Sequence, residues 1–158
     1  MLLSCVAISC AASEKPVPVT AAKAAPPPTA KLSWMPLDPF DAPVVARAIN
    51  DEMSRVKLAG TSPGVRAAVS MEVAQLAIEC IQPTPACYRA VGHSLGADRL
   101  MWAQIDPGDD KIRVTVVLFE VGPGTETRKV GTFEGVQAAR VGVAALVGYA
   151  TAPGTSHP

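Results

Sequence analysis

Apolar residues recur every three or four positions in four segments of the chain, and this spacing gives an α-helix one buried face. We expect helices over residues 41–59, 70–80, 85–95 and 134–149. The side chains expected to point inward are, in chain order, Val45, Ile49, Met53 and Val56; Val73, Leu76, Ala77 and Cys80; Cys87, Val91 and Leu95; and Val136, Ala139, Val143, Leu146 and Val147. The flanking residues agree, because Asp41, Ser70 and Thr84 can each cap a helix start and Gly96 can end a helix.

After Asp98 the apolar pattern loses its helical spacing and predicts strands. Residues 100–105 form one strand, Asp106-Pro107-Gly108-Asp109 a tight turn, and residues 111–121 a longer second strand. Two further strands are expected over 65–69 and 128–133. These elements predict one α/β (α+β) domain over residues 41–150, followed by a flexible tail over 151–158. Its mostly antiparallel sheet has three to four strands, and three to four helices pack on one face.

Composition excludes one large class of partners. The 158 residues include 14 basic and 14 acidic side chains, so the net charge is zero and there is no field to attract nucleic acid. Two Trp, two Tyr and three Phe are too few and too scattered to form a platform for stacking bases. We therefore expect no DNA or RNA partner.

The first 13 residues, MLLSCVAISCAAS, are apolar and small, as in the later part of a secretory signal, and are too few to span a bilayer. Both cysteines follow apolar and small residues, as in the lipobox that ends the signal of a bacterial lipoprotein. We expect Cys10 to carry the lipid, because more apolar chain precedes it, and Cys5 is the alternative. No Lys or Arg precedes either cysteine, so either translation starts further upstream or the segment is not a signal and its cysteines are incidental.

Residues 14–40 are rich in Pro and Ala and contain a run of three prolines at 26–28. Such a composition cannot build a core and is typical of an extended, semi-rigid spacer. Trp34, Met35, Leu37 and Phe40 interrupt the spacer near its end and can dock on the domain. A lipidated cysteine followed by this linker predicts a domain held at a membrane of the bacterial envelope, facing the periplasm.

Cys80 and Cys87 flank a proline-rich turn between two predicted helices. In an exported protein they are expected to form a disulfide, which would stabilise the fold by about 2 to 3 kcal/mol in the chain-entropy model. Two alternatives are free buried thiols in a reducing compartment and a zinc site. Zinc needs four ligands and the chain has only two His, so we expect no metal and no other cofactor.

Gly92-His93-Ser94-Leu95-Gly96 fits the G-x-S-x-G nucleophile elbow of α/β-hydrolases. A triad would then combine Ser94 with Asp106, or with Asp109 or Asp110, and with His157. However, an elbow needs a strand before the serine and a helix after it, whereas the local spacing places the motif at the end of a helix. His157 also lies in a tail that nothing in the sequence would hold in place. We therefore expect no catalytic residues and keep the serine hydrolase as an alternative.

The helix that ends in Leu95-Gly96-Ala97-Asp98, followed by Leu100, a strand, a tight turn and the longer strand through Val114–Val121, resembles a segment of known bacterial envelope domains. Those domains are similar to the amino-terminal domain of TolB, the periplasmic β-propeller protein of the Tol system, and to the curli-secretion lipoprotein family. The resemblance covers about residues 86–133. It implies an α/β envelope module that binds proteins or assembles, with no catalytic residues to carry over.

Together these features predict a non-catalytic envelope lipoprotein with an accessory role in protein binding or assembly. Its partners would be envelope proteins that the sequence does not name, and it would reach the membrane through its lipid. A purely structural spacer module is a further alternative. It differs from the binding module only in whether an exposed face or edge of the sheet has a partner.

Overall fold

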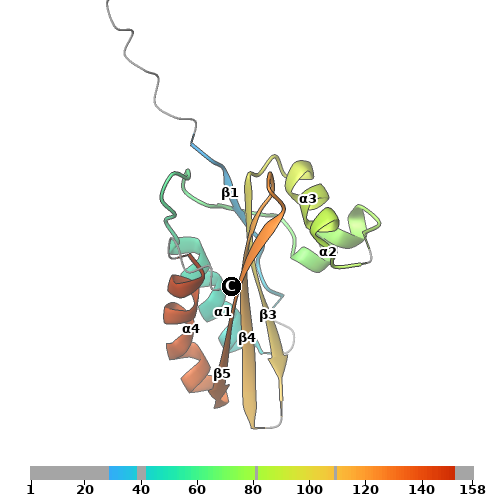
Figure 1. The fold of residues 1–158 in the computed structure, drawn as a ribbon. Coiled ribbons are helices and arrows are strands. Elements are labelled where there is room, and N and C mark those ends of the chain that lie inside the picture. Colours follow the sequence, from blue (N-terminus) through green and yellow to red (C-terminus); the bar gives the residue numbers. More distant parts are fainter. Residues whose placement is uncertain (1–28, 39–41, 81, 109, 152–158) are drawn as a thin grey trace, which may run out of the picture.

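Two long antiparallel strands, β3 (Arg99–Pro107) and β4 (Lys111–Glu120), form the hairpin around which the other elements are arranged (Figure 1). The computed structural model describes residues 29–38, 42–80, 82–108 and 110–151. β5 (Thr125–Glu134) pairs with β4 along its whole length, again antiparallel. The structure thus confirms the predicted hairpin and third long strand, and with them the mostly antiparallel α/β class.

A short strand, β1 (Leu32–Trp34), lies parallel to β3 on the side opposite β4. It is followed at the edge by β2 (Val65–Arg66), so the sheet has five strands in the order β2-β1-β3-β4-β5. The backbone N–H of Lys31 donates to the Asp98 carboxylate at 2.8 Å and ties the start of β1 to the start of β3. The sequence placed β1 in the linker, and the predicted count of three to four strands was one too low.

Helices cover both faces of the sheet, so the prediction that they pack on one face was wrong (Figure 1). α1 (Pro43–Arg55) and α4 (Gly135–Thr151) cover one face, where they bury Met101 of β3 and Val114 and Val116 of β4. α2 (Met71–Ala77) and α3 (Pro85–Ser94) cover part of the other, with Trp102 and Phe119 beneath them. The physical reason is that consecutive residues of β3 and β4 are apolar, and successive side chains of a strand point to opposite faces.

Two predicted helix caps are present and two predicted buried faces need correction. The side chains of Ser70 and Thr84 accept hydrogen bonds from the third residue beyond them, at the starts of α2 and α3. α2 is rotated from its expected face: it buries Met71 and Ala74, while Val73, Leu76 and Ala77 are exposed and Cys80 lies beyond the helix. Val56 follows α1, and Leu95 and Val136 are also more exposed than predicted. Asp41, the predicted cap of α1, lies outside the described residues.

Candidate functional site

The Gly92–Gly96 motif lies at the carboxyl end of α3, and no strand leads into it. Ser94 is exposed, and its hydroxyl donates to the backbone carbonyl of Val91 at 2.8 Å. Gly92 faces Val121, and a β-carbon at position 92 would overlap the valine side chain. Gly96 ends the helix with φ +60°, a left-handed backbone that glycine adopts without strain. The small residues of the motif therefore serve packing and helix termination.

The candidate acid of the triad is far from the serine. Asp106 lies near the end of β3 and Ser94 just before its start, and β3 spans about 23 Å between Arg99 and Asp106 at 3.3 Å per residue. Asp110 follows the β3–β4 turn at the same distant end, whereas Asp109 and His157 lie outside the described residues. Ser94 and Asp106 are therefore not brought together as a nucleophile–base–acid arrangement requires.

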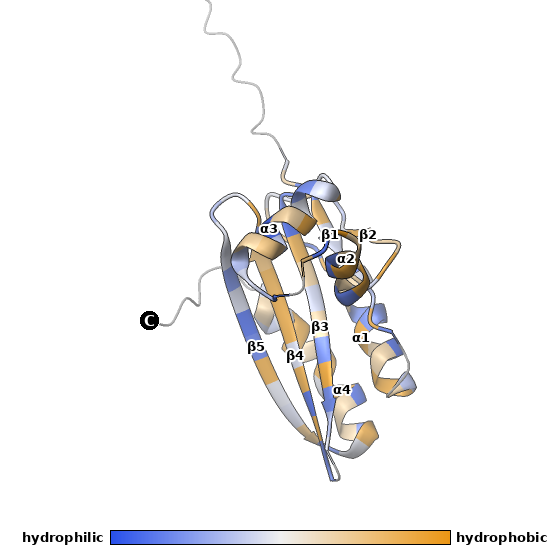
Figure 2. Ribbon diagram, turned by 90° about the vertical axis from the view of Figure 1, so that its right-hand side faces the viewer, coloured by the Kyte–Doolittle hydropathy of each residue, from blue (hydrophilic) through white to orange (hydrophobic). Residues whose placement is uncertain are grey.

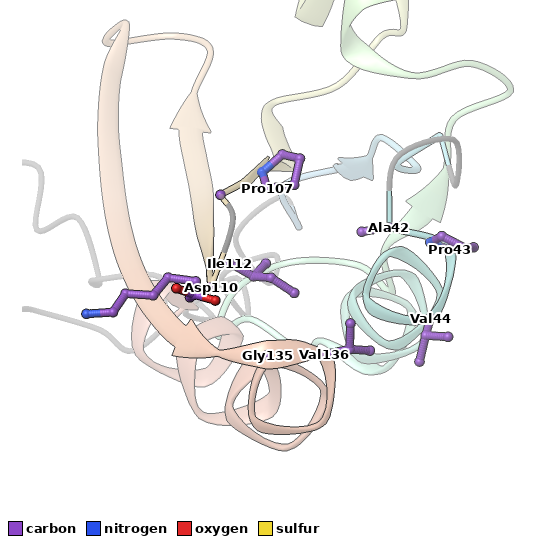
Figure 3. Close-up of a pocket in the computed structure, with 10 residues that line it drawn as sticks. Ala42, Pro43, Val44, Pro107, Asp110, Ile112, Gly135 and Val136 are labelled. Carbon is purple, nitrogen blue, oxygen red and sulfur yellow. The ribbon is translucent and has the colours of Figure 1, made fainter.

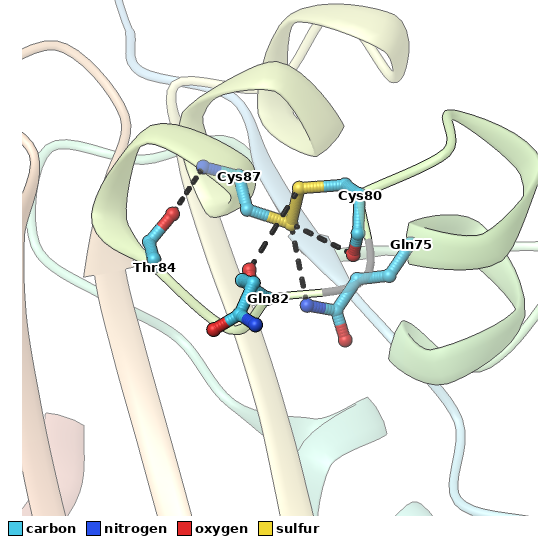
Figure 4. Close-up of a disulfide and its surroundings, with 5 residues drawn as sticks. All are labelled: Gln75, Cys80, Gln82, Thr84 and Cys87. Atoms are coloured by element: carbon cyan, nitrogen blue, oxygen red, sulfur yellow. Dashed lines mark hydrogen bonds between the residues drawn. A yellow bond between two sulfur atoms is a disulfide. The ribbon is translucent and has the colours of Figure 1, made fainter.

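Cys80 and Cys87 form a disulfide that links the segment after α2 to the first turn of α3 (Figure 4). Their α-carbons are 5.7 Å apart, within the usual range for such a bond. Gln75 Nε2 donates to Cys87 Sγ at 3.3 Å, and Thr84 Oγ1 accepts from the Cys87 backbone N–H. The bond thus fixes the two helices that cover the second face of the sheet.

α2 and α3 leave half of their face of the sheet uncovered. Figure 2 views this side of the molecule, with α3 over one end of the strands and no helix in front of the other end. Following the register, two rows of side chains cross the uncovered half, which we call the open face: Gln104, Thr115 and Val130 form one row, and Asp106, Arg113 and Thr132 the other. Thr115 is half-buried, and the other five residues are exposed to solvent. Such a flat polar surface can form hydrogen bonds and ion pairs with another protein.

A groove of about 590 Å³ runs along one side of the open face, between β3 and the start of α2. Asp38, Glu72 and Asp106 contribute three carboxylates to its lining, together with the apolar Leu37 and Val73. Arg113 lies 3.9 Å from Asp106 in an exposed ion pair, which contributes little to stability. The groove therefore combines negative charge with an apolar wall.

Aromatic packing supports the covered half of the same face. The ring of Tyr88 from α3 lies 4.6 Å from that of Trp102 and 5.5 Å from that of Phe119, between ring centroids. Burial raises the pKa of the Tyr88 phenol, and the nearby Glu126 carboxylate raises it further, while Arg128 acts in the opposite direction. Tyr88 was not among the predicted core residues, although it lies beside Cys87 and Val91 on the predicted inner face.

A second hollow, of about 310 Å³, lies at the far end of the molecule where the first turns of α1 and α4 meet the β3–β4 turn (Figure 3). Pro43, Val44, Ile112 and Val136 give it mainly apolar walls, and Asp110 and Lys111 lie at one side. No set of polar groups converges there among the residues whose structure is described. We assign no chemistry to it.

The described residues contain neither a candidate metal site nor a membrane-spanning helix. Residues 29–38, 42–80, 82–108 and 110–151 contain no group of three or more His, Cys, Asp or Glu placed to hold a metal ion. Within the same ranges, no helix has the length and apolar character needed to cross a membrane. Cys5 and Cys10, the candidate lipid sites, lie outside these ranges.

Comparisons with known proteins give one weak structural similarity and no family. No protein-family model matches the chain, and the curated proteins contain no significant match. Among solved structures, the fold is similar to the LpoB C-terminal domain from Salmonella enterica. The two share 11% sequence identity with a TM-score of 0.46, over 68% of this chain and 85% of that one. At this level of similarity no function is transferred from that domain to this chain.

Proposed function

We propose that the chain is a non-catalytic lipoprotein of the bacterial envelope, whose domain binds another protein through the open face of its sheet. The observation that carries the proposal is the second face of the sheet. α2 and α3 cover only part of it, and polar side chains of β3, β4 and β5 are exposed on the rest. A domain that served only as a spacer would not need an uncovered sheet face bordered by a groove of this size.

The envelope location is supported by the leader and the disulfide. Cys10, or alternatively Cys5, follows apolar and small residues, and the Pro/Ala-rich segment up to β1 is a suitable spacer between a lipid and a folded domain. The Cys80–Cys87 disulfide fits an oxidising compartment such as the periplasm. The resemblance around Leu95-Gly96-Ala97-Asp98 to bacterial envelope domains points the same way.

The chemistry of the open face indicates what kind of partner would bind there. Asp38, Glu72 and Asp106 favour a basic side chain in the groove. The row of Gln104, Thr115 and Val130 favours polar contacts, with an apolar contact at its β5 end. A protein segment with one or more Lys or Arg residues beside apolar ones therefore matches this surface. Such interfaces are polar at the rim and depend on salt concentration.

Site-specific photo-crosslinking in a bacterial host tests this proposal. A photoreactive residue at Gln104, on the open face, should give discrete crosslinked products with envelope proteins, and adding Glu72→Lys should reduce their yield. The control is a photoreactive residue at Asp51, an exposed residue of α1 on the opposite side of the sheet. Equal products from both positions, or none from either, would contradict binding through the open face and favour the spacer.

A further inference from the structure

β5 leaves a long edge of the sheet unpaired within the described part of the chain. It is the outermost strand, and along its ten residues only the side toward β4 is paired. The opposite edge of the sheet is β2, which has only two residues. Figure 2 shows β5 as the outer, largely hydrophilic strand beside the more hydrophobic β4. An exposed strand edge of this length can accept another strand through backbone hydrogen bonds.

α4 carries an exposed apolar stripe on the same side of the molecule. Ala138, Val141, Ala145 and Tyr149 follow one another at helical spacing, and all four are exposed, Val141 by 73% and Tyr149 by 67%. The stripe contains no charge. It is uncovered in the monomer, and we call it the α4 stripe.

Contacts on the two sides of α4 show which way the stripe faces. A β-carbon at Gly142 would overlap the ring of Phe133 on β5, so this side of the helix lies against β5. Val136 lines the hollow shared with Pro43 and Val44 of α1, so that side faces α1. At 100° per residue, Ala138, Ala145 and Tyr149 lie within about 60° of Gly142 on the side away from Val136, whereas Val141 lies further round and points away from the sheet. The α4 stripe therefore borders the open edge of β5 through Ala138, Ala145 and Tyr149.

We propose that β5 and α4 together form the interface of a two-fold symmetric dimer of this chain. An extended peptide could pair with β5 but could not reach a stripe on a helix above the sheet. An occupant that covers both surfaces needs a strand with a helix packed over it, and the β5–α4 unit of a second copy has this form. The proposed dimer interface shares only Val130 and Thr132 with the open face, and the proposal does not depend on the proposed function.

The spacing of the elements agrees with this arrangement. Neighbouring strands lie about 4.8 Å apart, and α4 packs over both β4 and β5. If the axis of α4 lies midway above these two strands, joining β5 to its symmetry mate brings the two α4 axes to about 10 Å apart, which is the usual distance between packed helices. Small residues such as Ala138 and Ala145 suit a close approach of this kind.

Charge selects the register of the two strands. In an antiparallel pair about a two-fold axis at Gly131, Arg128 lies opposite the partner's Glu134, and the same contact occurs twice. Val130, which is 54% exposed in the monomer, then lies opposite the partner's Thr132.

Other centres are less favourable. An axis at Arg128 or Lys129 would set that residue against itself, and an axis at Val130 would oppose Glu126 and the partner's Glu134. An axis at Thr127 also pairs unlike charges, Glu126 with the partner's Arg128, but it joins only residues 125–129 of each strand, whereas the axis at Gly131 joins residues 128–134.

Analytical ultracentrifugation tests the dimer with the full chain, carrying Cys5→Ala and Cys10→Ala so that neither lipid nor an extra disulfide can associate two copies. We expect a concentration-dependent dimer mass. Ala138→Arg should weaken the dimer at least about tenfold, because it places two charges where the two α4 helices approach each other. Leu76→Arg is the matched control, since Leu76 is 68% exposed on α2, and it should leave the dissociation constant unchanged.

Charge reversal tests the register. Arg128→Glu alone and Glu134→Arg alone should each weaken the dimer about tenfold, and the double variant should restore it because the two pairs are re-formed in reverse. Circular dichroism should show that every variant is folded. A monomer mass at all concentrations up to about 0.1 mM, or equal effects of Ala138→Arg and Leu76→Arg, would overturn the dimer. Failure of the double variant to restore association would overturn the register.

Discussion

Ser94 illustrates how a motif can match a catalytic pattern while each of its residues has a structural use. Its hydroxyl is bonded to the carbonyl of Val91 within the last turn of α3, a common way for serine to satisfy the end of a helix. Gly92 allows α3 to approach Val121, and Gly96 provides the left-handed residue that ends the helix. The spacing of glycine and serine is the same as in an elbow, but the preceding secondary structure differs.

A fluorophosphonate probe tests the role of this serine. We expect the purified full chain to remain unlabelled, because the Ser94 hydroxyl donates to the Val91 carbonyl and the candidate acid Asp106 lies near the far end of β3. Ser94→Ala should change the free energy of unfolding by less than about 1 kcal/mol, as expected for an exposed side chain with one local hydrogen bond. Stoichiometric labelling that disappears in Ser94→Ala would instead support the hydrolase.

Because of Tyr88, the stability of the folded chain should fall at alkaline pH. Its phenol has a raised pKa in the folded state, chiefly through burial, so the folded chain keeps this proton where the unfolded chain loses it. The contribution to stability is complete below the unfolded pKa of about 10 and is lost as the pH rises through the higher folded pKa.

This pH dependence can be measured in Tyr149→Phe, which leaves Tyr88 as the only tyrosine. Titration followed by tyrosinate absorbance should show ionisation above pH 10, accompanied by loss of thermal stability. Tyr88→Phe should show a smaller loss of stability over the same pH range. Ionisation of Tyr88 at the pH found for the unfolded chain would contradict its burial.

Among the elements, the Cys80–Cys87 disulfide has the most direct test. Replacing both cysteines by serine should lower the free energy of unfolding by about 2 to 3 kcal/mol, because the unfolded chain regains the entropy of a closed loop. Chemical denaturation of both forms measures the difference. A reducing agent should have the same effect on the parent chain and no effect on the double variant. Free thiols in protein isolated from the periplasm would contradict the predicted bond.

Local sequence determined some elements and left others open. α3 carries its own cap and stop, and the β3–β4 hairpin has a turn sequence between two alternating runs, so both could be predicted from nearby residues. β1 could not, because three residues among prolines form a strand only by pairing with β3, which lies more than sixty residues later. The face of α2 was missed for a similar reason: with seven residues the helix gives a weak periodic signal, and its packing depends on distant partners.

For the candidate site, the sequence provided the disulfide but not the open face. Cys80 and Cys87 are close in the chain, so their pairing follows from separation and compartment alone. The open face brings together residues of three strands, and it exists only because α2 and α3 cover half of the sheet. The consecutive apolar residues of β3 and β4 indicate that both faces are buried, but the length of the cover could not be inferred from single strands.

For the molecule as a whole, truncation defines where the folded domain begins. Deleting residues 1–28 should leave a domain with an unchanged thermal unfolding temperature, since all described elements lie beyond them. Deleting residues 1–36 should prevent cooperative folding, although the sequence alone predicted that this segment is dispensable. The longer deletion removes the buried Leu32, Trp34 and Met35. At about 1.5–3 kcal/mol each, these side chains account for much of the ~5–15 kcal/mol that stabilises a domain.

Circular dichroism and calorimetry on the two truncated forms measure this difference. A matched form with residues 1–28 deleted and Leu32→Ala should be folded but less stable, which separates loss of packing from loss of the chain segment. A cooperative transition for the chain lacking residues 1–36 would show that the domain folds without β1.

The lipid anchor can be tested apart from the fold. In a chain given a complete bacterial signal, Cys10→Ala should move the protein from the membrane fraction to the soluble periplasm, because the expected lipid site is lost. Its melting temperature should not change, since residue 10 precedes every described element. The matched Cys5→Ala form should stay with the membrane. The reverse result would assign the lipid to Cys5.

The place of β1 also governs when the chain can fold during synthesis. Trp34 pairs with Met101, so β1 leaves the ribosome long before the strand that must hold it. Until β3 has emerged, its apolar side chains remain exposed, and pairing between such distant segments is a slow step in folding. The sheet of such a chain is completed late in synthesis. That delay fits the export proposed above, in which an extended chain crosses a membrane before it folds.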